Sequence, residues 1–212
     1  MRNSSVLVLA STNRHKFEEF SSLFKAYPEI AIAPVNEYIR NADKLGLVET
    51  SDHYYDNAIS KARLANHGCH YPCIADDSGL EVDALEGRPG VRSHRYAIPR
   101  LGETQDNANN QKLLTELKGV PSEKRTARFV CHVALVMEGV FLHVAGTLEG
   151  TIAMELKGNQ GFGYDSLFIP KGQVQTLGEL GPEVKNKISH RALAVAAFMD
   201  EIKKQEIVFA KP

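Results

Sequence analysis

The stretch SVLVLASTNRHKFEEFSSLFKAY, residues 5–27, changes from a strand pattern to a helix pattern within a few residues. Its beginning, SVLVLA, is almost wholly apolar, which is typical of a short strand buried on both faces. Phe17, Phe20, Phe24 and Tyr27 then recur at intervals of three and four residues, which places them on one face of a helix. We therefore expect a strand, a polar turn and a helix in this order.

The rest of the chain mixes the same two patterns. Residues 126–137 and 140–148 are rich in strand-forming residues and are joined by Glu138-Gly139, which predicts a hairpin. Further strands are expected at 29–35, 73–75 and 80–85. Helices are expected at 54–67, ending at Gly68, at 104–117, and after Ser189 as an N-cap, with Val195, Phe198, Met199 and Ile202 on one side. Residues 41–53 look irregular. The order indicates the α/β class with a mixed sheet.

Composition excludes several functional classes. The 25 Lys and Arg residues nearly balance the 26 Asp and Glu residues of the 212-residue chain, which argues against a general nucleic-acid-binding protein but not against a small anionic ligand. No apolar run approaches 18 residues, so no membrane span is expected, and the N-terminal apolar run is too short for a signal peptide. Three cysteines without a strong metal-binding spacing indicate free thiols in a reducing cytoplasm.

Two adjacent carboxylates, Asp76 and Asp77, directly follow the apolar residues 73–75. Buried carboxylates are costly unless they are paired or bound to a metal, and hard oxygen ligands at a strand end suit Mg²⁺. Because adjacent strand residues point to opposite faces, we expect the two side chains to have different roles. The alternative is an Asx-turn formed by Asp-Asp-Ser-Gly, without any chemistry.

The polar turn between the first strand and helix is a second candidate. It contains Ser11, Thr12, Asn13, Arg14, His15 and Lys16. A helix N-terminus offers backbone N–H groups and the positive end of a dipole to a phosphate, and Lys16 adds a charge. The turn lacks the glycines of a Walker A loop. The alternative is a plain N-cap with a solvated lysine.

Two later segments complete the candidates. GFGYD, residues 161–165, has glycines that permit close approach to a ligand, and Phe162 and Tyr164 offer rings on which a base can stack. EVKNKISHR, residues 183–191, brings together Lys185, Lys187, His190 and Arg191. The alternatives are a tight loop with an aromatic plug and a solvated basic turn.

Taken in order, LASTNRHKFEEF, DNAISKAR, ADDSGLEVDALEGRPGVRSHRYA, NNQKLL, GFGYDSLF and KNKISHRALA resemble the successive motifs of the inosine triphosphate pyrophosphatase family, the Ham1-type dITP/XTP pyrophosphatases. The resemblance implies a single ITPase-like domain over residues 1–212. Its fold would be an elongated mixed β-sheet flanked by helices, with two lobes and a nucleotide cleft between them, usually as a homodimer. Its activity would be the Mg²⁺-dependent hydrolysis of ITP, dITP and XTP to the monophosphate and pyrophosphate in the cytoplasm.

The resemblance also implies roles by position. Asp77 matches the proton acceptor and a metal ligand, and Ser78 matches a substrate contact. The phosphate-binding turn is matched by Ser11, Thr12, Asn13, Arg14, His15 and Lys16, and the contacts to the nucleoside and phosphates by Phe162, Gly163, Tyr164, Asp165, Lys185, His190 and Arg191. The expected partner is a small purine nucleoside triphosphate, with no nucleic acid and no membrane.

Three positions depart from the family's pattern. Thr12 stands where glycine is frequent, and Ser166 stands where proline often follows GYD. Val48-Glu49 replaces a pair of glutamates, which leaves Glu49 as the expected second acidic ligand. Two rival functions stay open: a Maf-type pyrophosphatase for pyrimidine or methylated nucleotides, against which ISHR and GFGYD count, and a non-catalytic nucleotide-binding module.

Overall fold

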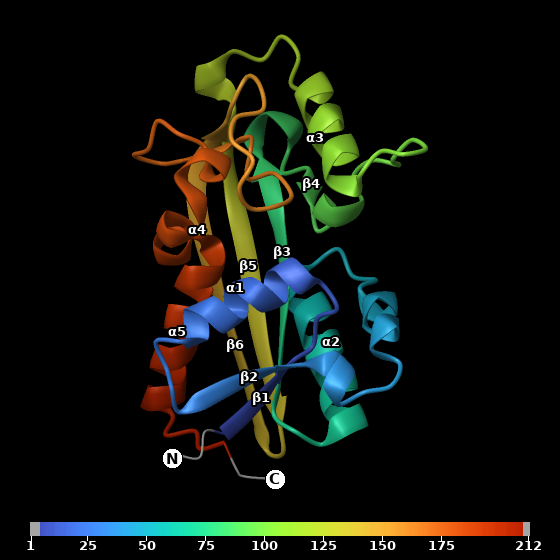
Figure 1. Ribbon diagram of the computed structural model, residues 1–212, viewed down its shortest axis with the longest axis vertical. Coiled ribbons are helices and arrows are strands. Elements are labelled where there is room, and N and C mark those ends of the chain that lie inside the picture. Colours follow the sequence, from blue (N-terminus) through green and yellow to red (C-terminus); the bar gives the residue numbers. More distant parts are fainter. Residues whose placement is uncertain (1–4, 210–212) are drawn as a thin grey trace. The chain divides into compact units, whose positions relative to one another are not determined.

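The computed structural model describes residues 5–209 and contains one mixed sheet. The strands are β1 (Ser5–Leu9), β2 (Ile30–Pro34), β3 (Cys73–Val82), β4 (Pro89–Gly90), β5 (Thr126–Met137), β6 (Val140–Ile152) and β7 (Phe168–Pro170). The α-helices are α1 (Arg14–Phe24), α2 (Tyr54–Cys69), α3 (Gln105–Glu116), α4 (Leu177–Ile188) and α5 (His190–Lys204). The strand order is β2-β1-β3-β5-β6-β7, with β4 paired to β3. Figure 1 labels strands β1 to β6. β1 runs parallel to β2 and β3, whereas β4 and β7 pair antiparallel with β3 and β6, which confirms the expected mixed α/β fold.

The chain divides into two compact units. The first unit consists of the residues up to Asp77, Cys131–Gly146 and the residues from Arg191 onward. The second unit consists of Ser78–Val130 and Thr147–His190. β3, β5 and β6 therefore each contribute residues to both units. Within residues 5–209, no helix has the length and apolar character needed to cross a membrane.

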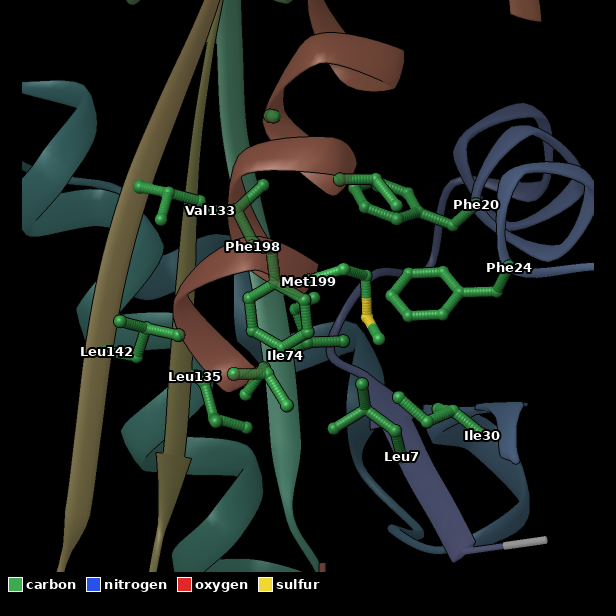
Figure 2. Packing of buried hydrophobic residues seen from close by; sticks show 14 of the residues in the cluster. Leu7, Phe20, Phe24, Ile30, Ile74, Val133, Leu135, Leu142, Phe198 and Met199 are labelled. Atoms are coloured by element: carbon green, nitrogen blue, oxygen red, sulfur yellow. The ribbon is translucent and has the colours of Figure 1, made fainter. Parts of the chain in front are cut away.

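The core of the first unit follows from the alternation of side chains along β1. Leu7 and Leu9 belong to a buried cluster that also contains Phe20 and Phe24 of α1 and Phe198 of α5 (Figure 2). The alternate β1 residue Val8, together with Ala10, belongs to a second cluster, to which α2 contributes Ala58 and Ala62. Since successive strand residues point to opposite faces, α1 and α5 cover one face of these strands and α2 covers the other. This double burial explains why SVLVLA has no polar alternation.

The second unit has its own core. Leu80 and Val82 from β3 pack in one cluster with Leu113 of α3, Phe129 of β5 and Phe168 of β7. The rings of Phe129 and Phe168 lie 4.5 Å apart between centroids. Helix α3 is therefore anchored on the strands of the second unit, and its Thr104 N-cap accepts a hydrogen bond from the N–H of Asn107, as expected for a helix over 104–117.

Several expectations are confirmed and others are wrong. The first two strands, the hairpin and the final helix occur as predicted, with β6 extending to Ile152. However, β3 is continuous, so the expected acidic turn between strand pieces, and with it the Asx-turn, is wrong. The strand continues through Asp76 and Asp77 because their buried carboxylates find charged partners, described below.

Three further local expectations are corrected. Helix α2 passes Gly68 and ends at Cys69, where His70 takes the left-handed conformation (φ 62°) that glycine more often provides. Residues Ala42–Val48, expected to be irregular, form a 3₁₀ helix. The alternative of a solvated basic turn for residues 183–191 is wrong, because residues 183–188 are the last part of α4, whose helix pattern is interrupted by non-helical Gly181 and by Pro182.

Candidate active site

The two adjacent aspartates of β3, Asp76 and Asp77, point to opposite faces of this strand. Ile74 belongs to the cluster covered by α1 and α5, whereas Ala75 belongs to the cluster covered by α2. By strand alternation, Asp76 shares the face of Ile74, and Asp77 shares the face of Ala75. The charged contacts of the two carboxylates agree with this division.

Asp76 is held by cations from α1 and α5. The carboxylate is fully buried, and its Oδ2 atom lies 2.9 Å from Lys16 Nζ and 3.6 Å from Arg191 Nε. Arg191 also pairs with Glu19, at 2.8 Å between Nη1 and Oε2. Burial opposes ionisation of Asp76, but Lys16, Arg191 and Lys61 outweigh it and hold the pKa of Asp76 well below its usual range. Asp76 is therefore a permanently ionised group at neutral pH.

Asp77 has a different environment. It is 6% exposed, and its Oδ2 atom accepts a hydrogen bond of 2.9 Å from Nδ2 of Asn57. Its Oδ1 atom lies 3.9 Å from Nζ of Lys61. Burial raises the pKa of Asp77 above its ordinary value, and the opposing effects of Lys61, Lys16 and Asn57 do not cancel it. A carboxylate whose pKa is raised is a stronger base, which suits proton abstraction.

Lys61 connects the acidic groups on the α2 side. Its buried ammonium lies 2.5 Å from Oε1 of Glu49 and donates to the backbone carbonyl of Asp76 at 2.5 Å. Burial disfavours the charged form, but Asp76, Asp77 and Glu49 outweigh this effect and raise the pKa of Lys61. Glu49 and Asp77, the two expected metal ligands, thus share one cationic neighbour.

Asn57 and Lys61 were not predicted from the sequence. A usable signal was present: they are four residues apart, so they lie on one face of α2, and this is the face that also buries Ala58 and Ala62. A lysine and an asparagine on a buried helix face need polar partners. The side chain of Asn57 is itself fixed, because Nδ2 donates to the carbonyl of Ser51 and Oδ1 accepts from its N–H.

Two carboxylates near Lys61, those of Glu49 and Asp77, are candidate oxygen ligands for a metal. Within residues 5–209, no group of three or more His, Cys, Asp or Glu side chains is arranged to hold an ion. Mg²⁺ uses one or two carboxylates and completes its coordination with water and substrate phosphates. Glu49 and Asp77 are the carboxylates that could contribute to such a site, with Lys61 beside both of them.

The polar turn at residues 11–16 leads into α1. Asn13 is the N-cap, and its Oδ1 atom accepts a hydrogen bond from the N–H of Lys16 at 3.2 Å; its own N–H donates to Oγ of Ser11. Thr12 and His15 are exposed, and Arg14 pairs with Glu18 on the surface at 2.8 Å. Lys16 differs from these neighbours, since its side chain is directed to Asp76 and is 15% exposed.

In the second unit, the loop Gly161–Asp165 is held by its own carboxylate. Oδ2 of Asp165 accepts a hydrogen bond from the N–H of Phe162 at 2.9 Å and lies 2.5 Å from Nζ of Lys185. The same ammonium lies 4.6 Å from the centroid of the Phe162 ring. Gly161 has φ +80° and leaves room for the Asp165 carboxylate, which a Cβ atom at this position would strike. The glycine is therefore required by the approach of Asp165.

Side chains of helix α3 bind the same loop through hydrogen bonds, and the sequence did not predict these contacts. The N–H of Gly163 donates to Oδ2 of Asp106 at 2.7 Å, and its carbonyl accepts from Nδ2 of Asn110 at 2.9 Å. The hydroxyl of Tyr164 donates to the carbonyl of Ser93 at 2.8 Å. Gly163 thus has both of its backbone groups fixed by one helix.

The remaining predicted residues fall into both units. His190 is buried in the second unit, and its ring stacks on Phe129 at 4.8 Å between centroids. Ser78, also in the second unit, is partly exposed and directly follows Asp77 in β3. Arg191 belongs to the first unit with Asp76, whereas Lys185 belongs to the second unit with Asp165.

The chain matches known proteins over most of its length. A model of the Ham1 family matches residues 7–201. A dITP/XTP pyrophosphatase of Desulforamulus reducens is 44% identical over 198 residues, which cover 92% of this chain and 94% of the relative. A dITP/XTP pyrophosphatase of Bacillus subtilis is 41% identical over 194 residues, covering 89% of this chain and 92% of the relative.

Solved structures agree with these sequence matches. The Ham1 protein of Staphylococcus aureus superposes with a TM-score of 0.80 at 34% identity and covers 94% of this chain and 99% of that one. A structure from Mycobacterium abscessus, described as a nucleoside-triphosphatase or dITP/XTP pyrophosphatase, gives a TM-score of 0.70 at 37% identity and covers 91% and 97%.

Proposed function

Because the chain belongs to the Ham1 family, we propose that it hydrolyses the non-standard purine nucleoside triphosphates dITP, ITP and XTP to the monophosphate and pyrophosphate. Such a reaction removes deaminated purines from the nucleotide pool. The observation that carries the proposal is the difference between two adjacent aspartates of β3. Asp76 is ionised and bound by cations, whereas Asp77 has a raised pKa.

Asp77 acts as the general base in this mechanism. Its carboxylate takes a proton from a water molecule, whose oxygen attacks the α-phosphorus. The bond between the α-phosphorus and the bridging oxygen breaks, and pyrophosphate leaves with the electron pair of that bond. The raised pKa of Asp77 favours the proton transfer, while Asn57 fixes the orientation of the carboxylate.

Lys16 and Lys61 have distinct tasks. Lys16 pairs with Asp76 through one contact, and an ammonium has three N–H donors, so it can bind Asp76 and a phosphate oxygen together. The α1 N-terminus adds backbone dipoles to the same phosphate. Lys61 pairs with Glu49 and lies beside Asp77, which holds the two carboxylates in place. The family's phosphate-binding turn is thereby tied to the acidic strand.

Magnesium is the proposed cofactor. Glu49 and Asp77 are the residues that would hold it, in company with the phosphates of the substrate. When bound, it supplies positive charge that neutralises the triphosphate and the departing pyrophosphate.

Base selection is assigned to the second unit. The ring of Phe162 offers a face for stacking, and Lys185, fixed by Asp165, provides an N–H donor next to that ring. Hypoxanthine and xanthine carry an acceptor at position 6, whereas adenine carries an amino donor. A site built for one hydrogen-bonding pattern rejects the other by roughly 10⁴-fold, since its own polar groups would lose their partners.

The decisive experiment measures pyrophosphate release. The protein is incubated with Mg²⁺ and dITP, ITP, XTP, dATP, dGTP, dUTP or dTTP, and phosphate is detected by malachite green with and without inorganic pyrophosphatase. We expect a signal with dITP, ITP and XTP that depends on the coupling enzyme. Phosphate without that enzyme would indicate cleavage at the γ-phosphate. Equal turnover of dITP and dATP would contradict the proposed base selection.

The same panel decides between the rival functions. Preferential turnover of dUTP or dTTP would indicate the Maf-type activity on pyrimidine nucleotides. Tight binding of dITP in calorimetry without any turnover would indicate a non-catalytic binding module.

We also propose that the enzyme works in the cytoplasm as a homodimer. Three free cysteines are consistent with a reducing compartment. The exposed side chains of Tyr55, Leu64 and Phe141 in the first unit provide apolar surface of the kind that subunit contacts use. Light scattering coupled to size-exclusion chromatography distinguishes a mass near 47 kDa, about twice the 23.4 kDa of the chain, from the monomer.

A further inference from the structure

Two cysteine thiols of the first unit lie in contact away from the phosphate-binding turn. Cys69 is the last residue of α2, Cys73 is the first residue of β3, and their sulfur atoms are 3.4 Å apart. Cys73 is fully buried, whereas Cys69 is partly exposed, and neither is in a disulfide. A disulfide has sulfur atoms about 2.05 Å apart, so about 1.4 Å of closure would join them.

We propose that Cys69 and Cys73 form a reversible oxidation site, at which a peroxide converts the two thiols into an intrachain disulfide and slows turnover. In the first step, the sulfur of Cys69 attacks a peroxide oxygen, the O–O bond breaks, and Cys69 sulfenic acid and water result. In the second step, the sulfur of Cys73 attacks that of Cys69, the S–O bond breaks, and the hydroxide leaves as water with the Cys73 proton. Each sulfur loses one electron, and the peroxide oxygens take both.

The environment of the two thiols assigns these roles. Peroxide reaches Cys69 from solvent, since this side chain is partly exposed, but it does not reach the buried Cys73. Burial and the neighbouring Cys69 raise the pKa of the Cys73 thiol, so Cys73 stays protonated and is not the thiol that peroxide oxidises first. The contact of 3.4 Å then places Cys73 beside the sulfenic acid.

The effect on turnover follows from the elements that the disulfide joins. Helix α2 carries Asn57 and Lys61, and β3 carries Asp77, which both of them contact. Closing the sulfurs moves the last residue of α2 against the first residue of β3, and so changes the position of the same helix relative to the same strand. Since a displacement of about 1 Å at reacting groups costs up to roughly 10²-fold in rate, we expect kcat to fall at least about fivefold in the oxidised protein.

The test uses the whole protein and reads the modification directly. After treatment with hydrogen peroxide, remaining thiols are alkylated and the protein is digested with trypsin. Cys69 and Cys73 fall in one peptide, residues 64–92, because Pro89 protects the bond after Arg88, while Cys131 falls in another. We expect the first peptide to lose two hydrogens, about 2 Da, and to escape alkylation. Turnover of dITP should fall and recover with dithiothreitol.

Matched variants complete the test. Cys69→Ser and Cys73→Ser should form no disulfide and should keep their turnover after peroxide, whereas Cys131→Ser should respond like the wild-type protein. An alkylated 64–92 peptide, a disulfide without slower turnover, or equal sensitivity of Cys69→Ser would each overturn the proposal. Inactivity of the reduced protein on dITP would refute the proposed function instead, and the peptide mass would still decide whether the oxidation site exists.

Discussion

Replacing Asp77 by asparagine separates catalysis from stability. The change keeps the shape of the side chain and removes its charge, and the amide oxygen can still accept the hydrogen bond from Asn57. General-base catalysis contributes about 10²–10⁴-fold in rate. We therefore expect Asp77→Asn to lower kcat for dITP by a factor in this range, which corresponds to about 2.7–5.5 kcal/mol of lost transition-state stabilisation.

The stability of this variant follows from the direction of the pKa shift. Because the pKa of Asp77 is raised in the folded protein from an ordinary value of 3.8, the folded state holds its proton more tightly than the unfolded state. Wild-type stability consequently falls as pH rises from 3.8 through the raised pKa, and the loss persists at neutral pH. Asp77→Asn lacks this ionisation, so its melting temperature at pH 7 should equal or exceed that of the wild type.

The neighbouring residue supplies the matched control. Asp76→Asn makes the same chemical change one position earlier, but it leaves Lys16 and Arg191 without their shared carboxylate. Breaking a buried ion pair costs about 3–5 kcal/mol. For a chain of this size, that corresponds to a fall in melting temperature of roughly 6–20 °C. The pKa of Asp76 is lowered, so this stabilisation is present above pH 3.8 and is lost only as pH falls through the lowered pKa.

Two measurements on the wild type, Asp77→Asn and Asp76→Asn test whether Asp77 is the base. Pyrophosphate release from dITP gives kcat, and scanning calorimetry at pH 7 gives the melting temperature. We expect a stable Asp77→Asn protein with strongly lowered kcat and an Asp76→Asn protein with a lowered melting temperature. Asp77→Asn with more than about a tenth of wild-type kcat, or with a melting temperature as low as that of Asp76→Asn, would refute the assignment of Asp77 as the base.

Three further predictions concern the metal, the base loop and the pH profile. Glu49→Gln should raise the Mg²⁺ concentration needed for half-maximal turnover at least tenfold, because one carboxylate ligand is lost; an unchanged magnesium titration would contradict this role. Asn110→Ala should raise the KM for dITP more than it lowers kcat, since it frees the carbonyl of Gly163, and Asn110→Gln should restore part of the effect. Below neutral pH, kcat/KM should decline with a midpoint above 3.8, as expected from the raised pKa of Asp77, and a midpoint at or below 3.8 would count against it.

The sequence alone predicted much of the fold because its local patterns agree with the tertiary structure. SVLVLA is a short apolar run, the Glu138-Gly139 hairpin joins two strand-rich segments and the final helix has a helical spacing of apolar residues, and all three elements occur. The errors arose where long-range contacts override local preference. Two aspartates, a serine and a glycine resemble a turn, yet β3 continues through them because cations from other elements neutralise the buried charge.

The site was predicted less completely than the fold. The resemblance to the family supplied residue positions, but the neighbours that give them their properties come from distant parts of the chain. Lys61 and Asn57 act on Asp77 across 16 and 20 residues of sequence, and Asn110 acts on Gly163 across 53. Such contacts depend on how a helix is placed against a strand, which no short motif encodes.

The alternation of a single strand explains why two identical, adjacent residues differ in their chemistry. Asp76 faces the side where α1 and α5 provide Lys16 and Arg191, so its charge is compensated and its pKa is lowered. Asp77 faces α2, where one ammonium is shared with Glu49, so burial prevails and its pKa is raised. The same lysine also binds the carbonyl of Asp76, which couples the two environments. A shift of one residue in the register of β3 would turn each aspartate to the opposite face, and for this reason the parallel pairing of β1 with Cys73 and Ile74 is as necessary to the proposed catalysis as the carboxylates themselves.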